Sequence, residues 1–207
     1  MKSTIPCATL LFGALLLAGC YPESPEYIDE YDLVYTDYSP TYDFGAQTTY
    51  ALPDSVVKFT GNLAEGDAPE MVSPVYGNVV LSAIRDNMNS YGWVEVEATE
   101  SPDVLVLPSV ISTTYISWSS GGYWGWYYPW YGGWYYPGYY PPTVSSMSTG
   151  SLIIQMADPN DPSANENLPV VWISAINGLL EGSTSGLITR IDRSVDQAFE
   201  QSNYLKQ

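Results

Sequence analysis

Side chains that could carry chemistry are scarce in this sequence of 207 residues. There is no histidine, and the two cysteines are Cys7 and Cys20. The lack of histidine excludes Ser-His-Asp and Cys-His nucleophiles, and it removes the usual general base near neutral pH. It also removes the commonest metal ligand. The groups left to consider are Cys20, the carboxylates and the aromatic rings.

Cys20 follows a segment with the features of a secretory signal peptide. Lys2 provides the positive charge, and the apolar run that follows is shorter than the about 20 residues that span a bilayer. The motif Leu17-Ala18-Gly19-Cys20 then resembles the bacterial lipobox, in which a peptidase cuts before a cysteine whose thiol carries diacylglycerol. We therefore expect cleavage between Gly19 and Cys20 and lipidation of the Cys20 sulfur.

The expected lipidation determines the fate of both cysteines and the location of the chain. Cys7 lies in residues 1–19, which would be removed, so no disulfide is expected. Two or three acyl chains, palmitate among them, make a durable anchor where a single chain is marginal. Proteobacterial lipoproteins kept at the inner membrane tend to have Asp after the cysteine. Tyr21 stands there instead, which favours the outer membrane, on its periplasmic face or at the cell surface.

The charge balance restricts the partners. The sequence has 6 basic and 23 acidic residues, a net charge of −17. Binding to nucleic acid depends on Lys and Arg contacts with phosphates, so no nucleic-acid partner is expected. A basic patch for anionic headgroups is also lacking, and attachment to a membrane would depend on the lipid.

The segment 123–140 consists almost wholly of Trp, Tyr, Gly and Pro, within an insertion that we place at residues 119–142. Its rings could stack on sugars, enter a protein interface or lie at the level of lipid headgroups. They could equally pack on one another or on the domain. A protein partner, self-association and an envelope glycan therefore stay open. The candidate binding residues are Trp124, Trp126, Tyr127, Trp130, Tyr131 and Trp134.

The carboxylates form no recognisable site in the sequence. Asp158, Asn160 and Asp161 are weak candidates for calcium ligands, but their loop lacks the glycine of an EF-hand, and a solvated turn is the simpler interpretation. Asp103 and Asp192 are interpreted as a turn former and a surface charge. We expect no metal, no cofactor and no enzyme activity.

The pattern of apolar residues predicts the order strand, helix, four strands, helix. The helices are indicated by apolar stripes of 3.6-residue period, one over 80–91 and one over 188–199. The strands are predicted at 48–52, 93–96, 104–118, 150–157 and 169–176, with a polar loop over 53–74. The expected fold class is α+β: a two-layer, mainly antiparallel sheet with both helices packed on one face.

Residues 20–41 are predicted to be a lipidated cysteine and a tether, because Tyr, Pro and acidic residues dominate them and no apolar period is present. The tyrosines Tyr31, Tyr35 and Tyr38 could dock back on the domain, but repulsion among the acidic residues favours an open tether. Residues 42–207 are then one α+β domain.

The domain resembles the DUF4136 family of bacterial lipoproteins. The resemblance rests on Tyr42-Asp43-Phe44, Tyr91-Gly92, Pro102-Asp103-Val104, Gly150-Ser151-Leu152 and Val171-Trp172, together with their order and spacing. Two departures, at Leu52 and at 173–175, are interpreted as changes in packing. The resemblance implies the fold and the lipoprotein class, and it carries over no catalytic residues.

These observations predict a lipid-anchored protein of the cell envelope that acts as a non-enzymatic binding or structural module. The aromatic segment is the expected contact. The alternative is an envelope glycan-binding protein, or a glycan hydrolase whose carboxylates the sequence does not identify.

Overall fold

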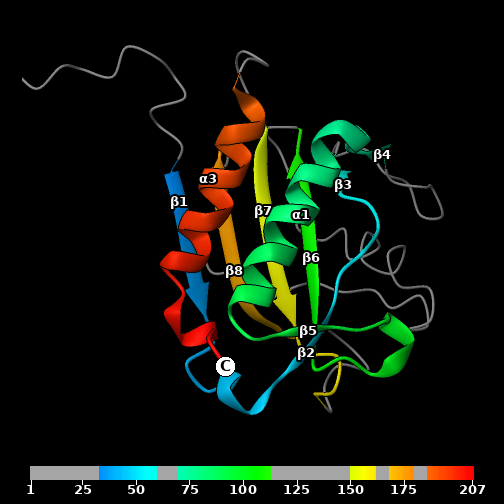
Figure 1. The fold of residues 1–207 in the computed structure, drawn as a ribbon, viewed down its shortest axis with the longest axis vertical. Coiled ribbons are helices and arrows are strands. Elements are labelled where there is room, and N and C mark those ends of the chain that lie inside the picture. The colour runs from blue at the N-terminus through cyan, green and yellow to red at the C-terminus, as the bar shows by residue number, and fades with distance from the viewer. Residues whose placement is uncertain (1–32, 60–69, 113–149, 162–167, 180–185) are drawn as a thin grey trace, which may run out of the picture. The chain divides into compact units, whose positions relative to one another are not determined.

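The computed structural model describes residues 33–59, 70–112, 150–161, 168–179 and 186–207. These residues form one sheet and two long helices (Figure 1). The strands are β1 (Leu33–Tyr38), β2 (Thr49–Ala51), β3 (Val57–Phe59), β4 (Glu70–Met71), β5 (Val94–Glu95), β6 (Val104–Ile111), β7 (Ser151–Ala157) and β8 (Val170–Asn177). The helices are α1 (Pro74–Ser90) and α3 (Leu187–Glu200), with short 3-10 turns at Phe44–Ala46, Ala98–Glu100 and Asn203–Leu205.

The sheet is mixed and mainly antiparallel, in the order β1-β8-β7-β6-β2-β5. The pairs β1–β8, β7–β8 and β6–β7 are antiparallel. On its other side β6 is parallel to β2 near its start and to β3 near its end, and β4 pairs antiparallel with β3. The predicted α+β class is therefore correct.

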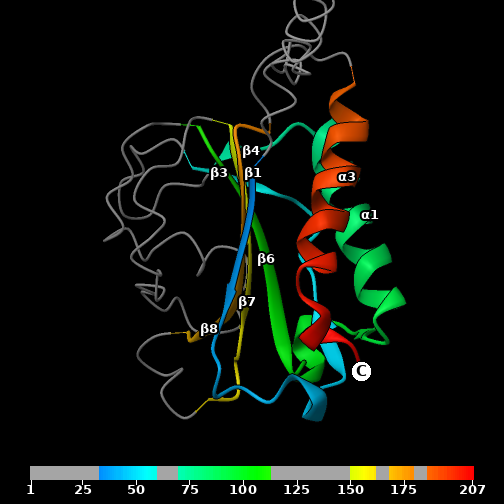
Figure 2. The ribbon, with the colours of Figure 1, turned by 90° about the vertical axis from the view of Figure 1, so that its left-hand side faces the viewer.

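Both helices cover the same face of the sheet, as Figure 2 shows. Pro74 occupies the first turn of α1, where a missing backbone N–H costs no helical hydrogen bond. The predicted stripe of α1 is buried against the sheet, with Ile84 and Met88 fully inaccessible. The stripe of α3 is buried in the same way through Ile191, Val195 and Phe199. Neither described helix is long and apolar enough to cross a membrane.

The main core lies between the helices and the sheet. Along each central strand alternate side chains face it, as the two-residue period of a strand requires, including Val104 and Val106 on β6 and Leu152 and Ile154 on β7. The opposite face is also apolar and carries a smaller cluster around Ile111, Ile153, Ile173 and Ala175. Because both faces are apolar, the central strands have no polar alternation, which agrees with the prediction of a buried β6.

The structure corrects two predictions. Residues 33–38, which we had assigned to the open tether, form the edge strand β1 and pair with β8 along its length. The strand could not be recognised in the sequence because tyrosines, an acid and a threonine interrupt the apolar pattern, and Val34 is the aliphatic residue that packs against the core. The predicted loop 53–74 contains β3 and β4, which are too short to show a period. The rest of the proposed tether, 20–32, lies outside the described residues.

Candidate functional site

Most of the site residues predicted from the sequence lie outside the part of the chain that the structure describes. These are Gly19 and Cys20 of the lipobox and the aromatic candidates Trp124, Trp126, Tyr127, Trp130, Tyr131 and Trp134. The lipid anchor and the aromatic contact therefore stay predictions.

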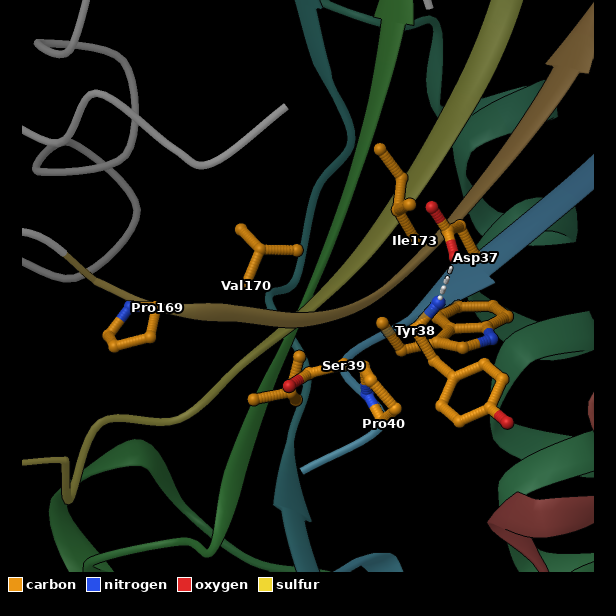
Figure 3. Close-up of a pocket in the computed structure, with 9 residues that line it drawn as sticks. Asp37, Tyr38, Ser39, Pro40, Pro169, Val170 and Ile173 are labelled. Carbon is orange, nitrogen blue, oxygen red and sulfur yellow. Dashed lines mark hydrogen bonds between the residues drawn. The ribbon is translucent and has the colours of Figure 1, made fainter. Parts of the chain in front are cut away.

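The described residues do form a pocket of about 510 Å³ where β1 ends beside the start of β8 (Figure 3). The β1 side consists of Asp37 and Tyr38 with the following Ser39 and Pro40, and the β8 side of residues 169–173. The antiparallel register places Asp37 opposite Ile173. The pairing continues past the strand, because the Ser39 N–H donates to the Val171 carbonyl at 2.8 Å.

The wall of the pocket is mainly apolar and includes one exposed aromatic ring. Tyr38 is 45% exposed and stacks on Tyr204, with the ring centroids 4.0 Å apart. Tyr204 donates its hydroxyl to Ser202, whose Oγ also accepts the Trp172 indole N–H at 2.9 Å. Because Trp172 is buried in the main core, these contacts hold the exposed tyrosine ring on a rigid base.

Asp37 is the single carboxylate among the described residues that line this pocket. Its Oδ1 accepts the N–H of Tyr38 at 2.8 Å and its Oδ2 accepts the Tyr35 hydroxyl at 3.3 Å. Glycoside hydrolysis requires two carboxyl groups about 5 to 10 Å apart across the substrate. The described lining thus offers hydrogen-bonding groups and an aromatic surface, which suit binding.

Asp103, interpreted from the sequence as a turn former, ties β2 to the start of β6. One of its oxygens accepts the N–H groups of Thr48 and Thr49, each at 2.8 Å, and the Thr49 hydroxyl at 2.8 Å. Burial alone would raise the pKa of Asp103, but these hydrogen bonds to the charged form outweigh it and the pKa is lowered. The Asp103 carboxylate therefore has a structural role, because its hydrogen bonds join β2 to the start of β6.

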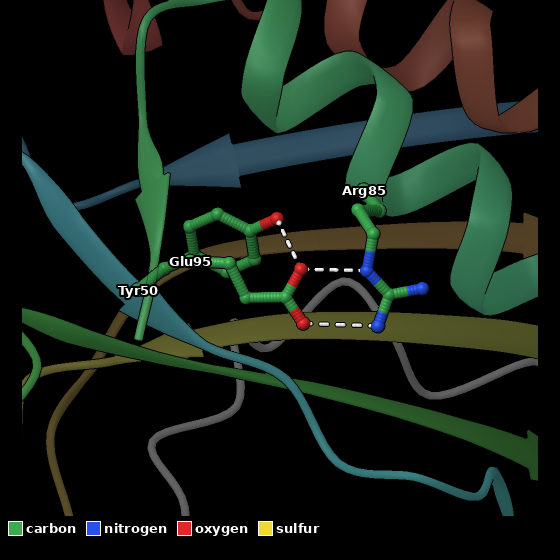
Figure 4. Close-up of polar contacts among 3 residues, drawn as sticks. All are labelled: Tyr50, Arg85 and Glu95. Carbon is green, nitrogen blue, oxygen red and sulfur yellow. Dashed lines mark hydrogen bonds and ion pairs between the residues drawn. The ribbon is translucent and has the colours of Figure 1, made fainter. Parts of the chain in front are cut away.

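A second carboxylate, Glu95, is held in a polar group with Arg85 and Tyr50 (Figure 4). Arg85 forms two bonds to the Glu95 carboxylate, at 2.6 and 2.9 Å, and the Tyr50 hydroxyl donates to the same group at 3.3 Å. Burial first, and then the negative charge of Glu95, raises the pKa of Tyr50. This group joins α1 to β2 and β5, and we assign it a structural role.

The weak calcium candidates form a turn. The Asp158 carboxylate accepts the Asn160 N–H at 2.8 Å, and the Asn160 amide donates to the Pro102 carbonyl at 3.0 Å. Burial, opposed in part by such hydrogen bonds, raises the pKa of Asp158. Within the described residues, Asp161 included, no group of three or more His, Cys, Asp or Glu side chains could hold a metal ion. The geometry agrees with the turn interpretation.

Nothing in the sequence indicates the pocket at Tyr38, because the β1 half of its lining falls in the predicted tether. Once the pairing of β1 with β8 is known, a two-residue alternation can be recognised in β1. Val34, Thr36 and Tyr38 alternate with Tyr35 and Asp37, and only the first set faces the helices: Val34 packs on the core, Thr36 contacts Gln201 and Tyr38 stacks on Tyr204. One aliphatic residue among the three that face the helices is too weak a pattern to recognise alone.

The fold defines the class of protein first: an α+β domain in which one layer of two helices packs on one face of a mixed sheet. The model of the family called domain of unknown function DUF4136 matches residues 34–202. The chain therefore belongs to the DUF4136 family, as its motifs indicated. The match begins within β1, which agrees with the correction of the tether boundary.

A solved structure of the same family gives the same result. A DUF4136 family protein from Bacteroides thetaiotaomicron is 30% identical, with a TM-score of 0.63, and the match covers 84% of this chain and 97% of that one. A PelC dodecamer from Paraburkholderia phytofirmans is 12% identical with a TM-score of 0.44, covering 85% and 99% of the two chains. A PDZ domain protein from Parabacteroides distasonis is 18% identical with a TM-score of 0.46, covering 85% and 36%. None of the curated proteins matches this chain.

Proposed function

We propose that this chain is a lipoprotein of the cell envelope, anchored through Cys20, whose domain is a non-enzymatic binding or structural module. The observation that carries the proposal is the motif Leu17-Ala18-Gly19-Cys20 directly after an apolar signal segment. The domain begins with β1 at Leu33, so the segment from 20 to 32 suffices as a short connection between the lipid and the fold. The proposed location is the outer membrane.

The anchor is tested in cells with two cysteine variants. Cys20→Ser should abolish incorporation of labelled palmitate and leave residues 1–19 attached to the chain, because the peptidase cuts only before the lipidated cysteine. Cys7→Ser is the matched control, because this residue lies in the segment that is removed before the protein matures. Palmitate incorporation that persists in Cys20→Ser, or is absent from the unchanged protein, would refute the anchor.

The binding role is supported by how the described carboxylates are used. Asp103 and Glu95 are held by the hydrogen bonds and ion pairs that join strands and helix, and Asp37 stands alone in the lining of the pocket. A module that binds through aromatic rings does not need the two facing carboxylates that glycoside hydrolysis requires. In this proposal the Trp/Tyr segment 123–140 and the pocket at Tyr38 are the two contact surfaces.

An envelope glycan is the second candidate ligand, and the pocket favours it. An exposed tyrosine ring beside a carboxylate and a serine hydroxyl matches the stacking and hydrogen bonding that sugar rings use. Titration with peptidoglycan fragments tests this by tryptophan fluorescence. Tyr38→Ala should weaken a saturable response at least several-fold, whereas Val94→Ala, at a position that is 56% exposed on β5 and outside the pocket lining, should leave it nearly unchanged. Equal effects would argue against the pocket.

A further inference from the structure

Four segments outside the described residues, 1–32, 60–69, 113–149 and 180–185, join the described residues at one end of the sheet. The register places Leu33 opposite Asn177, Ile176 opposite Leu152, and Ser151 opposite Ile111, so β1, β8, β7 and β6 have one common end. We call it the exit end. With neighbouring strands about 4.8 Å apart, the start of β1 and the end of β6 are about 14 Å apart there.

The exit end is the part of the domain nearest to Cys20 along the chain. At about 3.3 Å per residue, the chain from 20 to 33 reaches at most about 43 Å. The segment that contains the Trp/Tyr run, residues 113–149, also joins the described domain at this end, after β6 and before β7. Trp and Tyr are the residue types enriched at the level of lipid headgroups.

Exposed apolar side chains lie in the elements that begin or end here. Both helices start at the exit end, and β4 leads into α1 there (Figure 1). Val75 in the first turn of α1 is 62% exposed, Ile188 in the first turn of α3 is 48% exposed, and Met71 at the end of β4 is 39% exposed. Transfer of such exposed apolar side chains out of water is favourable, so contact with a less polar surface would lower their free energy.

The charges of the described residues are distributed unevenly between the two ends. The opposite end, where β6 starts and β7 ends, carries seven of the described acidic residues: Asp43, Glu95, Glu97, Glu100, Asp103, Asp158 and Asp161. At the exit end, Glu70 is paired with Lys58 at 3.0 Å. Neither helix has an acidic residue in its first turn, where the helix dipole places partial positive charge.

We infer that the exit end faces the bilayer and that Val75 and Ile188 contact its headgroup region. This inference rests on the proposed anchor at Cys20 and adds an orientation to it. The connection of at most about 43 Å limits how far the exit end can lie from the surface, and the exposed side chains contribute apolar contact. The pocket at Tyr38, which lies at the other end of β1, then faces away from the membrane.

Single cysteines on the full-length, lipidated protein test this orientation. In the proposed mature chain Cys20 is the one native cysteine and its sulfur forms a thioether with the lipid, so an introduced cysteine is the one free thiol. Val75→Cys and Ile188→Cys probe the exit end. Val94→Cys on β5 is the matched control, because Val94 is 56% exposed and pairs with Thr49 at the opposite end of the sheet.

Each variant is labelled with bimane and reconstituted into vesicles of phosphatidylethanolamine and phosphatidylglycerol that contain a headgroup-labelled quencher lipid. Quenching several-fold stronger at positions 75 and 188 than at 94 is the expected result. Equal quenching at the three positions, or stronger quenching at 94, would overturn the orientation. Flotation with the vesicles measures the anchor separately: protein that does not float refutes the anchor, whereas floated protein with equal quenching refutes the orientation alone.

Discussion

Arg85 on α1 binds Glu95 on β5 through two parallel bonds, from Nε to Oε2 at 2.6 Å and from a terminal guanidinium nitrogen to Oε1 at 2.9 Å. The strand β5 has only two residues and pairs with β2 alone among the described strands. Such a short edge strand has few backbone hydrogen bonds to hold it. The ion pair therefore secures the edge of the sheet to the helix layer.

We predict that the pair contributes about 1 kcal/mol, because both side chains are about one third exposed and exposed pairs contribute 1 kcal/mol or less. A double-mutant cycle with Arg85→Met and Glu95→Gln, measured by urea unfolding, gives this coupling energy. It should fall as the salt concentration rises. A coupling energy of zero at low salt would show that β5 is held by its strand pairing alone.

Asp103 should stabilise the fold at neutral pH. Asp103→Asn removes the charge from three hydrogen bonds that join β2 to β6, and we expect a loss of about 1–3 kcal/mol in the free energy of unfolding. Asp43→Asn is a control, since Asp43 is exposed and gives no side-chain hydrogen bond in the described part of its short helix. A loss no larger than that of the control would contradict the role of Asp103.

The same residue predicts a pH dependence. The pKa of Asp103 is lower in the folded chain than its ordinary value of 3.8, so its contribution is complete above that value. It is lost as the pH falls below 3.8 and through the lowered folded pKa. The stability difference between the unchanged protein and Asp103→Asn should therefore shrink over this range in acid. A difference that grows in acid would require the opposite pKa shift.

Asp192 on α3 predicts an effect of opposite sign. Burial, followed by the charges of Asp196 and Asp86, raises its pKa, so ionised Asp192 is less favourable in the fold than in the unfolded chain. Asp192→Asn should raise stability at pH 7 by a few tenths of a kcal/mol, in the range of like-charge pairs one helical turn apart. The gain should vanish at a pH where Asp192 is protonated in both states. Thermal unfolding at the two pH values measures it.

The loss of the Phe199 ring from the main core should lower the free energy of unfolding of the whole domain. Its ring is fully buried and lies between Tyr91 and Trp172, with ring centroids 5.7 and 5.6 Å away. Phe199→Ala should cost about 3–5 kcal/mol because it leaves a cavity. Val75→Ala, which removes apolar atoms from an exposed helical position, should cost less than about 0.5 kcal/mol. Urea unfolding compares the two variants.

The features that could be predicted from the sequence are those with a repeating apolar pattern. The stripes on α1 and α3 and the apolar runs of β6, β7 and β8 span several periods each, and all five elements were predicted. The strand β1 was missed because its partner β8 lies far along the chain and its six residues include few aliphatic ones, whereas β3 and β4 were missed because they have only three and two residues. Two or three residues carry too little pattern to reveal such pairing.

The candidate site was harder to predict than the fold for the same reason. The pocket joins residues 37–40 to residues 169–173, and no local signal connects two stretches so far apart. The lipobox and the Trp/Tyr segment were found because each is a contiguous run. Asp103 was interpreted as a turn former, whereas its bonds to Thr48 and Thr49 depend on the parallel pairing of β2 with β6, which the sequence does not display.

The most direct test of the central claim, the lipid anchor, is the mass of the mature protein isolated from the membrane fraction. The account predicts a chain that begins at Cys20 and is heavier than residues 20–207 by a diacylglyceryl group, with or without a further acyl chain, and the added mass should map to the N-terminal peptide. A mature chain with an unmodified Cys20, or one that still carries residues 1–19, would contradict it.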